Sequence, residues 1–360
     1  MTAEAEALSV LDDAAGRDQL DRSGLLARIE ALPEQCEDAW SAARAFAWPR
    51  RAASAKSVVV LGMGGSAIAG DILRSLAALS GDKPVAVVRG YDVPSFVGEG
   101  TLVVACSHSG NTEETVAGLD ASLARGAQAT IITTGGRLEK VAAEKGISAF
   151  TYTYEGQPRC ALGHQLMALL ALGECAGLMS DQTSAVAESL ALMRGQREAL
   201  KFAAPSAGNA AKQLALRLRG QIPVIVGEGV LADAAHRWKT QVNENSKSWA
   251  FWDELPEMDH NSVVGFGLPQ AMVQQLHVLF LLPTAIERRA EVRYEATADE
   301  LSRAGVAPER IDVAGESALA QVLSAIYLGD FVSYYLALLN GVDPTPIDPI
   351  SRVKARLAQG

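Results

Sequence analysis

The strongest constraint in this sequence is a β-branched run that ends in glycines and leads directly into a helical pattern. Residues 57–61 read SVVVL and are followed by GMGGS at 62–66, and apolar residues then recur at helical spacing over 68–79. A short buried strand, a tight glycine turn and an amphipathic helix form the repeating unit of a parallel sheet covered by helices on both faces. The chain is therefore predicted to be an α/β protein.

The alternation of strand and helix continues through the first half. Residues 161–218 are rich in alanine and leucine, and we expect helices there with a break near Pro205. Further strands are predicted at 85–88, 101–106, 129–133 and 149–154.

A second strand–glycine–helix unit begins at Gln221, where IPVIV leads into GEG at 227–229 and a helix predicted over 232–242. The two units indicate two related α/β halves, and a chain of 360 residues is long enough for about two domains. Further strands are predicted at 263–265, 278–282 and 311–313, and a long helix at 317–340. The predicted organisation is a helical arm over 1–50, a first domain over 51–200 and a second domain over 201–360.

Composition and charge exclude several classes of function. A formal net charge of −10 argues against a broad surface for nucleic acid, which needs clustered Lys and Arg. The first 20 residues have no basic segment before an apolar stretch, and the run at 278–282 is far shorter than the ~20 residues that span a bilayer, so neither secretion nor a membrane is predicted. Four widely spaced cysteines form no CxxC pair, which indicates reduced thiols in a cytoplasmic protein and no zinc site: Cys36, Cys106, Cys160 and Cys175.

Two loops in the first half carry groups that suit an anion. The loop at 62–66 offers backbone N–H groups and one hydroxyl, and the loop SHSGNT at 107–112 offers three hydroxyls, each at the start of a predicted helix. Ligands of doubly wound sheets bind at the carboxyl ends of strands, where unpaired N–H groups attract anions. We therefore predict that both loops hold one phosphate monoester through Gly64, Gly65, Ser66, Ser107, Ser109 and Thr112.

A dinucleotide-binding fold is the nearest alternative for these loops. Gly62, Gly64 and Ala67 approximate the GxGxxG/A fingerprint of a pyrophosphate turn. The second strand, however, ends at Arg89 and not at an acid that would bind a ribose. The hydroxyl-rich second loop has no role in a dinucleotide site, so a monophosphate is favoured.

The residues also resemble a known family. SHSGNTEET at 107–115 resembles the SxSGxTxET signature of sugar isomerase (SIS) domains, and GGS at 64–66 resembles their first phosphate loop. That pair indicates phosphosugar binding but no particular reaction, because SIS domains also occur in synthases and in regulators that only sense phosphosugars. NENSK at 243–247 and ELPEMDHN at 254–261 resemble segments of bifunctional phosphoglucose/phosphomannose isomerases. Further similar segments are LPEQ at 32–35, PRCALG at 158–163 and VDPTPI at 342–347.

The resemblance implies two doubly wound, flavodoxin-like SIS domains after a helical N-terminal arm. It implies an aldose–ketose isomerase that interconverts glucose 6-phosphate, and also mannose 6-phosphate, with fructose 6-phosphate, without metal or other cofactor. In the family, Glu244 corresponds to the base and His260 to the acid/base that opens the sugar ring, and this histidine comes from the other subunit of a homodimer. Arg159 and Lys354 are the candidate cations for the enediolate or the phosphate, and Thr345 is the candidate contact near C2.

The residues themselves are compatible with this chemistry. A carboxylate can take a C–H proton made acidic by an adjacent carbonyl, and we expect Glu244 near the strand ends of the second half. Trp238, Trp249, Phe251 and Trp252 surround this segment and are predicted to form an interface or a pocket wall. Two alternatives stay open: a non-catalytic phosphosugar sensor, which would need every phosphate contact but not Glu244 and His260, and an isomerase for another phosphosugar.

Overall fold

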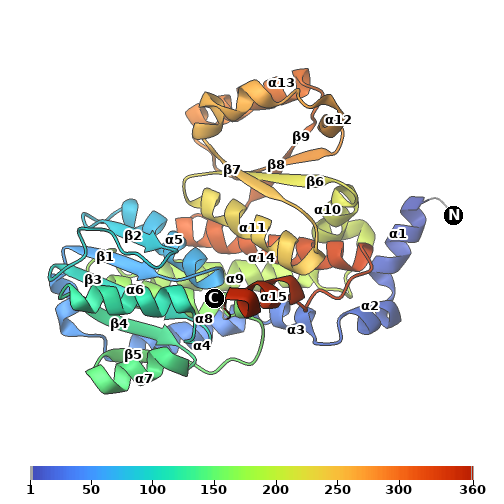
Figure 1. Ribbon diagram of the computed structural model, residues 1–360. Helices are drawn as coiled ribbons and strands as arrows, with labels where there is room; N and C mark the ends of the chain where they lie inside the picture. The colour runs from blue at the N-terminus through green and yellow to red at the C-terminus, as the bar shows by residue number, and fades with distance from the viewer. Residues whose placement is uncertain (1–2, 358, 360) are drawn as a thin grey trace.

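The structure is a computed structural model that describes residues 3–357 and residue 359. Two parallel sheets lie on different sides of the long helix α14 (Ala318–Leu339), as Figure 1 shows. A helical region precedes the first strand, so the predicted α/β fold with two parallel sheets and a helical N-terminal region is confirmed. That region contains α1 (Ala3–Asp12), α2 (Ala14–Leu20), α3 (Leu25–Glu30) and α4 (Leu32–Ala45).

The first sheet has the strand order β2-β1-β3-β4-β5, with every pair parallel. This order places the topological switch point between β1 and β3, because the chain crosses over in opposite directions on either side of them. The two predicted phosphate loops follow β1 and β3, so they leave neighbouring strands at the same edge of the sheet. The strands are β1 (Ser57–Leu61), β2 (Val85–Val88), β3 (Thr101–Ser107), β4 (Gln128–Thr133) and β5 (Ser148–Thr151).

The second sheet has the order β7-β6-β8-β9, and its pairs are also parallel. The strand predicted at 263–265 is wrong, because Ser262–Gly265 is a 3₁₀ turn. The strand that the sequence did not reveal is β7 (Phe251–Leu255), at the edge of the sheet, where only Leu255 is buried and no apolar run marks it. The other strands are β6 (Ile222–Glu228), β8 (Leu276–Pro283) and β9 (Pro308–Val313).

Helices cover both sheets and join them. In the first half these are α5 (Gly65–Ala78), α6 (Glu113–Ala124), α7 (Gly136–Lys145), α8 (Leu162–Cys175) and α9 (Thr183–Leu200). In the second half they are α10 (Ala210–Leu218), α11 (Val230–Ser246), α12 (Gln270–Val273), α13 (Arg288–Arg303) and α15 (Asp348–Leu357).

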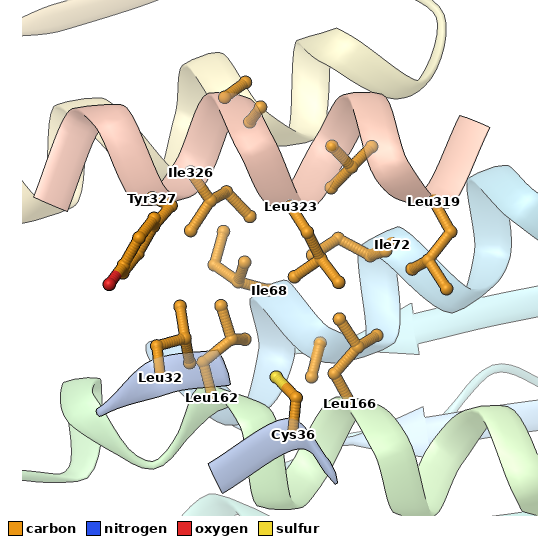
Figure 2. Packing of buried hydrophobic residues seen from close by; sticks show 14 of the residues in the cluster. Leu32, Cys36, Ile68, Ile72, Leu162, Leu166, Leu319, Leu323, Ile326 and Tyr327 are labelled. Atoms are coloured by element: carbon orange, nitrogen blue, oxygen red, sulfur yellow. The ribbon is translucent and has the colours of Figure 1, made fainter. Parts of the chain in front are cut away.

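The largest core cluster lies where α4, α5, α8 and α14 meet, and Figure 2 shows side chains from all four helices pointing toward one another. Helix α14 is long and apolar enough to cross a membrane by length and composition, but 94% of its apolar window is buried inside the fold. It is therefore placed as a core helix. Trp238 is also part of this core, where its indole donates to the Ala325 carbonyl oxygen, so the prediction of an interface or pocket position is wrong for this residue.

Helices α5 and α11 meet across a group of charged side chains. Arg74 on α5 lies 3.5 Å from carboxylate oxygens of both Asp71 and Asp233, and Arg89 pairs with Asp71. Asp233 is buried, and its Oδ2 has no hydrogen-bond partner among the described residues. Burial raises the pKa of Asp233 to about 6, because the ionised form loses its hydration there.

Asp233→Asn is expected to stabilise the protein at pH 7.5 by roughly 1–3 kcal/mol, because the wild type must keep an ionised carboxylate in a buried position. The pKa of Asp233 is higher in the folded than in the unfolded protein, so the wild type loses stability as the pH rises through 6. Toward pH 4, where the carboxyl of the folded protein is protonated, the stabilities of the wild type and of Asp233→Asn converge. Urea unfolding between pH 4 and 8 measures the difference. The exposed carboxylate of Asp120 provides the control Asp120→Asn, and a difference for Asp233→Asn that does not grow with pH would contradict the expectation.

Candidate functional site

The first phosphate loop is shaped by glycine at the start of α5. Gly64 has a φ of +52°, which a side chain rarely adopts, and it precedes the first turn of the helix. Ser66 is buried in that turn, and its Oγ accepts a hydrogen bond from Nε2 of Gln165 at 2.9 Å. The start of this helix and the Ser66 hydroxyl form one side of the candidate anion site, although the Ser66 N–H itself donates to the Met63 carbonyl oxygen.

The second phosphate loop is folded by its own hydroxyls. Ser107 Oγ accepts from the Gly110 N–H at 3.1 Å and lies 2.8 Å from Oγ1 of Thr112, the residue before α6. Ser109 Oγ accepts from the Asn111 N–H. Gly110 has a φ of +64°, and a Cβ there would lie 1.7 Å from the Gly135 carbonyl oxygen, so no other residue fits.

Arg159 joins the first loop to the second half of the chain. Its side chain is only 3% exposed, and a Cβ on Gly65 would touch the Pro158 carbonyl oxygen and Arg159 Cα at 3.4 and 3.6 Å. The guanidinium donates through Nε to Asn245 Oδ1 at 2.7 Å, and Nη1 lies 3.5 Å from Glu244 Oε2. Burial lowers the pKa of Arg159 and the Glu244 carboxylate opposes that change, so the guanidinium remains charged.

The same cation also holds the turn that contains Thr345. Arg159 Nη2 donates to the carbonyl oxygens of Pro344 and Thr345 at 2.8 and 3.0 Å. Lys247 Nζ donates to the Pro344 carbonyl oxygen at 3.0 Å and to that of Glu244. Thr345 Oγ1 is buried without a hydrogen-bond partner among the described residues. The end of α11 and the Thr345 turn are therefore fixed to one another beside Arg159.

The position of Glu244 differs from the expectation that it lies near the strand ends of the second half. Helix α11 starts at Val230, beside the carboxyl end of β6, and runs back along the sheet. Fourteen residues further on, Glu244 lies about 20 Å away, at the amino edge of the second sheet. There it faces the carboxyl edge of the first sheet, because Arg159, which lies 3.5 Å from Glu244, also lies against Gly65 of the first phosphate loop.

The structure does not bring His260 or Lys354 to this cluster. His260 is exposed and follows the carboxyl end of β7, the edge opposite to Glu244. Lys354 is exposed on α15 and has no hydrogen-bond or ion-pair partner in the part of the chain that the structure describes. One chain thus unites the two phosphate loops with Arg159, Glu244 and Thr345, and among the described residues no contact joins His260 or Lys354 to them.

Sequence reasoning missed three residues that support the site. Gln165 and Tyr152 connect the two phosphate loops from behind, and Lys247 fixes the end of α11. Lys247 lies inside the NENSK segment, which was a signal for it, whereas nothing in the sequence marked Gln165 or Tyr152. Over residues 3–357 and 359, no group of three or more His, Cys, Asp or Glu side chains is arranged to hold a metal ion.

Comparison with known proteins identifies both halves of the chain. The sequence matches the SIS domain over residues 53–157 and the bacterial phospho-glucose isomerase C-terminal SIS domain over residues 207–357. A hypothetical protein from Thermus thermophilus has a solved structure that shares the fold, with a TM-score of 0.75, 20% identity, and coverage of 99% of this chain and 96% of that chain.

Curated relatives are more similar in sequence. The bifunctional phosphoglucose/phosphomannose isomerase of Caldicellulosiruptor bescii is 37% identical over 91% of this chain and 97% of its own length. The enzyme of the same name from Aquifex aeolicus is 36% identical over 84% of this chain and 90% of its own length. With two SIS domains and relatives this similar along almost their whole length, the chain belongs to the bifunctional phosphoglucose/phosphomannose isomerase family.

Proposed function

We propose that this protein is an aldose–ketose isomerase that interconverts glucose 6-phosphate and mannose 6-phosphate with fructose 6-phosphate. The observation that carries the proposal is the buried Arg159 guanidinium, which lies against the first phosphate loop and 3.5 Å from Glu244. A phosphate held by the two loops would place the other end of an open-chain sugar toward this carboxylate. A sensor needs the loops alone, so nothing in this assembly of a base and a cation favours that alternative.

The reaction moves one proton between neighbouring carbons. From fructose 6-phosphate, Glu244 takes a proton from C1, the C–H electrons form the C1=C2 bond, and the oxygen on C2 is protonated to give a cis-enediol. The carboxyl group then returns the proton to C2, the oxygen on C1 loses its proton, and C1 becomes the aldehyde. Arg159 offsets the negative charge that develops on the two oxygens, so we assign no metal or other cofactor to the reaction.

The ring-opening residue is assigned to a second copy of the chain. Glu244 and His260 lie at opposite edges of the second sheet, so a single chain cannot bring them to one substrate. The edge strand β7, which leads to His260, is accompanied by exposed aromatic side chains: Trp249 is 76% exposed and Phe251 46%. An exposed apolar face of this kind is typical of an interface. A homodimer that covers this face would supply His260 to the partner's site.

Lys354 is assigned as a second cation for the substrate. Its amine has no partner in the described part of the chain, and helix α15 also exposes the apolar side chains of Val353 and Leu357. Lys354→Met is expected to raise KM for fructose 6-phosphate by about tenfold, the value of one charge-assisted hydrogen bond. The neighbouring Arg352→Met serves as the control in the same steady-state assay, and equal KM values for both variants would remove Lys354 from the site.

The test of the reaction is proton exchange followed by NMR. The protein is incubated with fructose 6-phosphate in D2O, and deuterium at C2 of newly formed glucose 6-phosphate and mannose 6-phosphate is the expected result. Binding of fructose 6-phosphate with neither product nor exchange would reject the isomerase and support the sensor.

The product ratio in this experiment also tests Thr345, whose buried hydroxyl we assign to the C2 specificity. Thr345→Val is expected to change the ratio of the two aldose phosphates at early times. An unchanged ratio would reject this role.

Lys247 gives an expected pH dependence. Its amine lies against the Glu244 and Pro344 carbonyl oxygens, where loss of hydration together with the Arg159 charge lowers the pKa of Lys247 to about 8. Above that pH, the amine loses the charge with which it holds the Pro344 carbonyl oxygen, so kcat/KM is expected to fall. Lys247→Arg keeps a charged donor at every accessible pH and should move this fall upward by about one pH unit or more. Rates between pH 6.5 and 9.5 test this, and superimposable profiles would contradict it.

We also place the enzyme in the cytoplasm. All four cysteines are free in the structure, and reduced thiols are typical of that compartment. Cell fractionation with an antibody against the chain tests this, and recovery outside the cytoplasmic fraction would reject it.

A further inference from the structure

A hydrogen-bonded network lies behind the two phosphate loops and connects them. Gln165, on helix α8, is fully buried, and its amide nitrogen donates to Ser66 Oγ at 2.9 Å and to Tyr152 Oη at 3.1 Å. Tyr152 Oη lies 3.3 Å from Nδ1 of His108, which belongs to the second loop. His164 stacks on the Tyr152 ring with 4.7 Å between ring centroids. None of these side chains takes part in the proton transfer described above.

The direction of each hydrogen bond in this network follows from which of its two groups carries the proton. Burial raises the pKa of Tyr152, so the phenol keeps its proton; it accepts from Gln165 and donates to His108 Nδ1. Burial lowers the pKa of His108, so the imidazole is neutral, and with Nδ1 as an acceptor its proton lies on Nε2. Ser66 Oγ accepts from the same amide as Tyr152 and donates to no group in the described part of the chain, so its proton remains available to a ligand.

The other hydroxyls of the phosphate site also keep protons for a ligand: Ser107 Oγ and Thr112 Oγ1 share one hydrogen bond in which either can donate, so one proton of this pair remains. Ser109 Oγ accepts from the Asn111 N–H, which leaves its proton free. The backbone groups at the starts of α5 and α6 are N–H donors. A ligand between the loops therefore meets protons, and it must supply acceptors.

We propose that Gln165 is a positioning residue that turns the Ser66 proton toward the ligand and so makes the site selective for the dianionic form of a phosphoryl group. The inference rests on the proposed function, since it concerns the phosphate site of that reaction. A dianionic phosphate monoester carries acceptors only, whereas the monoanion carries a P–O–H proton that needs an acceptor. The second pKa of such a monoester is about 6, so the two forms exchange within an accessible pH range.

Few groups around this network titrate between pH 5 and 7, and a sulfate probe separates their effect from that of the phosphate. Burial lowers the pKa of His164 to about 4, which keeps its imidazole neutral. Burial also lowers the pKa of His108, and on the adjoining α11 it raises the pKa of Asp233 to about 6; titration of either group acts on a phosphate and on a sulfate ligand alike. Burial raises the pKa of Tyr152, Tyr154 and Cys106, which keep their protons. The other charged or titratable groups on the elements around Gln165 are Glu34, Cys36, Glu37, Asp38 and Arg44 on α4, Asp71 and Arg74 on α5, Glu174 and Cys175 on α8, and Arg28, Arg159 and Cys160.

The test measures binding of sorbitol 6-phosphate, which has no carbonyl group and cannot isomerise, by calorimetry between pH 5 and 8. For the wild type, the affinity is expected to fall about tenfold from pH 7 to pH 5, with a midpoint near the second pKa of the probe. Sorbitol 6-sulfate has no proton to lose, and its affinity is expected to stay constant. A decline of equal size for the sulfate would assign the pH dependence to the protein and overturn the inference.

Two substitutions of Gln165 test whether this residue orients the Ser66 hydroxyl or only stabilises the fold. Gln165→Met removes the donor, lets Ser66 accept a proton from the monoanion, and should reduce the tenfold fall to less than about threefold. Gln165→Glu presents an acceptor that takes the Ser66 proton, and binding at pH 7 should weaken by more than about tenfold. Gln196→Met is the matched control. Gln165 and Gln196 each have a buried amide oxygen without a partner in the described chain, but Gln196 lies on α9. Thermal unfolding confirms that each variant is folded.

The outcomes distinguish this inference from the proposed function. A Gln165→Met protein that keeps the full pH dependence, or a Gln165→Glu protein that binds the probe as tightly as the wild type, would overturn the role of Gln165 while isomerisation stands. A wild type that does not isomerise fructose 6-phosphate but shows the expected profiles would reject the reaction and support Gln165. Absence of probe binding at pH 7 would reject both.

Discussion

Glu244→Gln is expected to lower kcat for the isomerisation of fructose 6-phosphate by about 10³-fold, with a range from 10² to 10⁴ for the loss of a general base. The amide has nearly the shape of the carboxylate but cannot take the C1 proton. Because no other carboxylate lies within hydrogen-bond range of the Arg159 guanidinium among the described residues, no neighbouring base should replace it. Deuterium incorporation at C2 should be lost together with product formation.

Binding should survive the same substitution, since the phosphate loops do not contain Glu244. The dissociation constant for sorbitol 6-phosphate is expected to stay within about threefold of the wild-type value, so that kcat changes far more than affinity. Glu198→Gln is the matched control, an identical chemical change at an exposed ion pair on α9. A Glu244→Gln enzyme that still incorporates deuterium at a wild-type rate would remove Glu244 from the role of base.

The parts of the fold that could be predicted are those whose burial requires a continuous run of apolar residues. Strand β3 is buried along its whole length, and the sequence TLVVAC shows it directly. Strand β7 could not be found, since it lies at the edge of the sheet, where only Leu255 is buried, and FWDEL shows no alternation. Helix α13 was also missed, because its residues are mostly charged and only Thr297 and Leu301 are buried.

The sequence predicts the residues of the candidate site but not their arrangement. Glycine and hydroxyl residues directly after a strand indicate an anion site, because their backbone N–H and hydroxyl groups are hydrogen-bond donors. The contact between Arg159 and Glu244 joins residues 85 positions apart and depends on how α11 packs on α5. Gln165 lies in an apolar helix with no local signal, and the role proposed for it follows only from the two hydroxyl groups to which it donates.

A mixed dimer tests whether Glu244 of one chain and His260 of the other form one active site, and a large change in activity is expected from it. Glu244→Gln and His260→Asn are each expected to reduce activity by at least about 10²-fold as homodimers, as is usual for the loss of a general acid or base. One Glu244→Gln chain and one His260→Asn chain, carrying different tags and purified through both, form two unequal sites. If His260 serves the partner's site, one of them contains the intact Glu244 and the intact His260, and about half of the wild-type activity per dimer should return.

The reciprocal dimer makes the test decisive, because it exchanges the expected outcomes. When both substitutions lie on one chain and the partner is wild type, each of the two shared sites is damaged once, one through Glu244 and the other through His260, and this dimer should be inactive. A site built within one chain would reverse both results: the first dimer would stay inactive and the second would keep about half of the activity. The separation of Glu244 and His260 at opposite edges of the second sheet favours the shared site. Failure to recover any protein through both tags would instead show that the chain does not form the dimer.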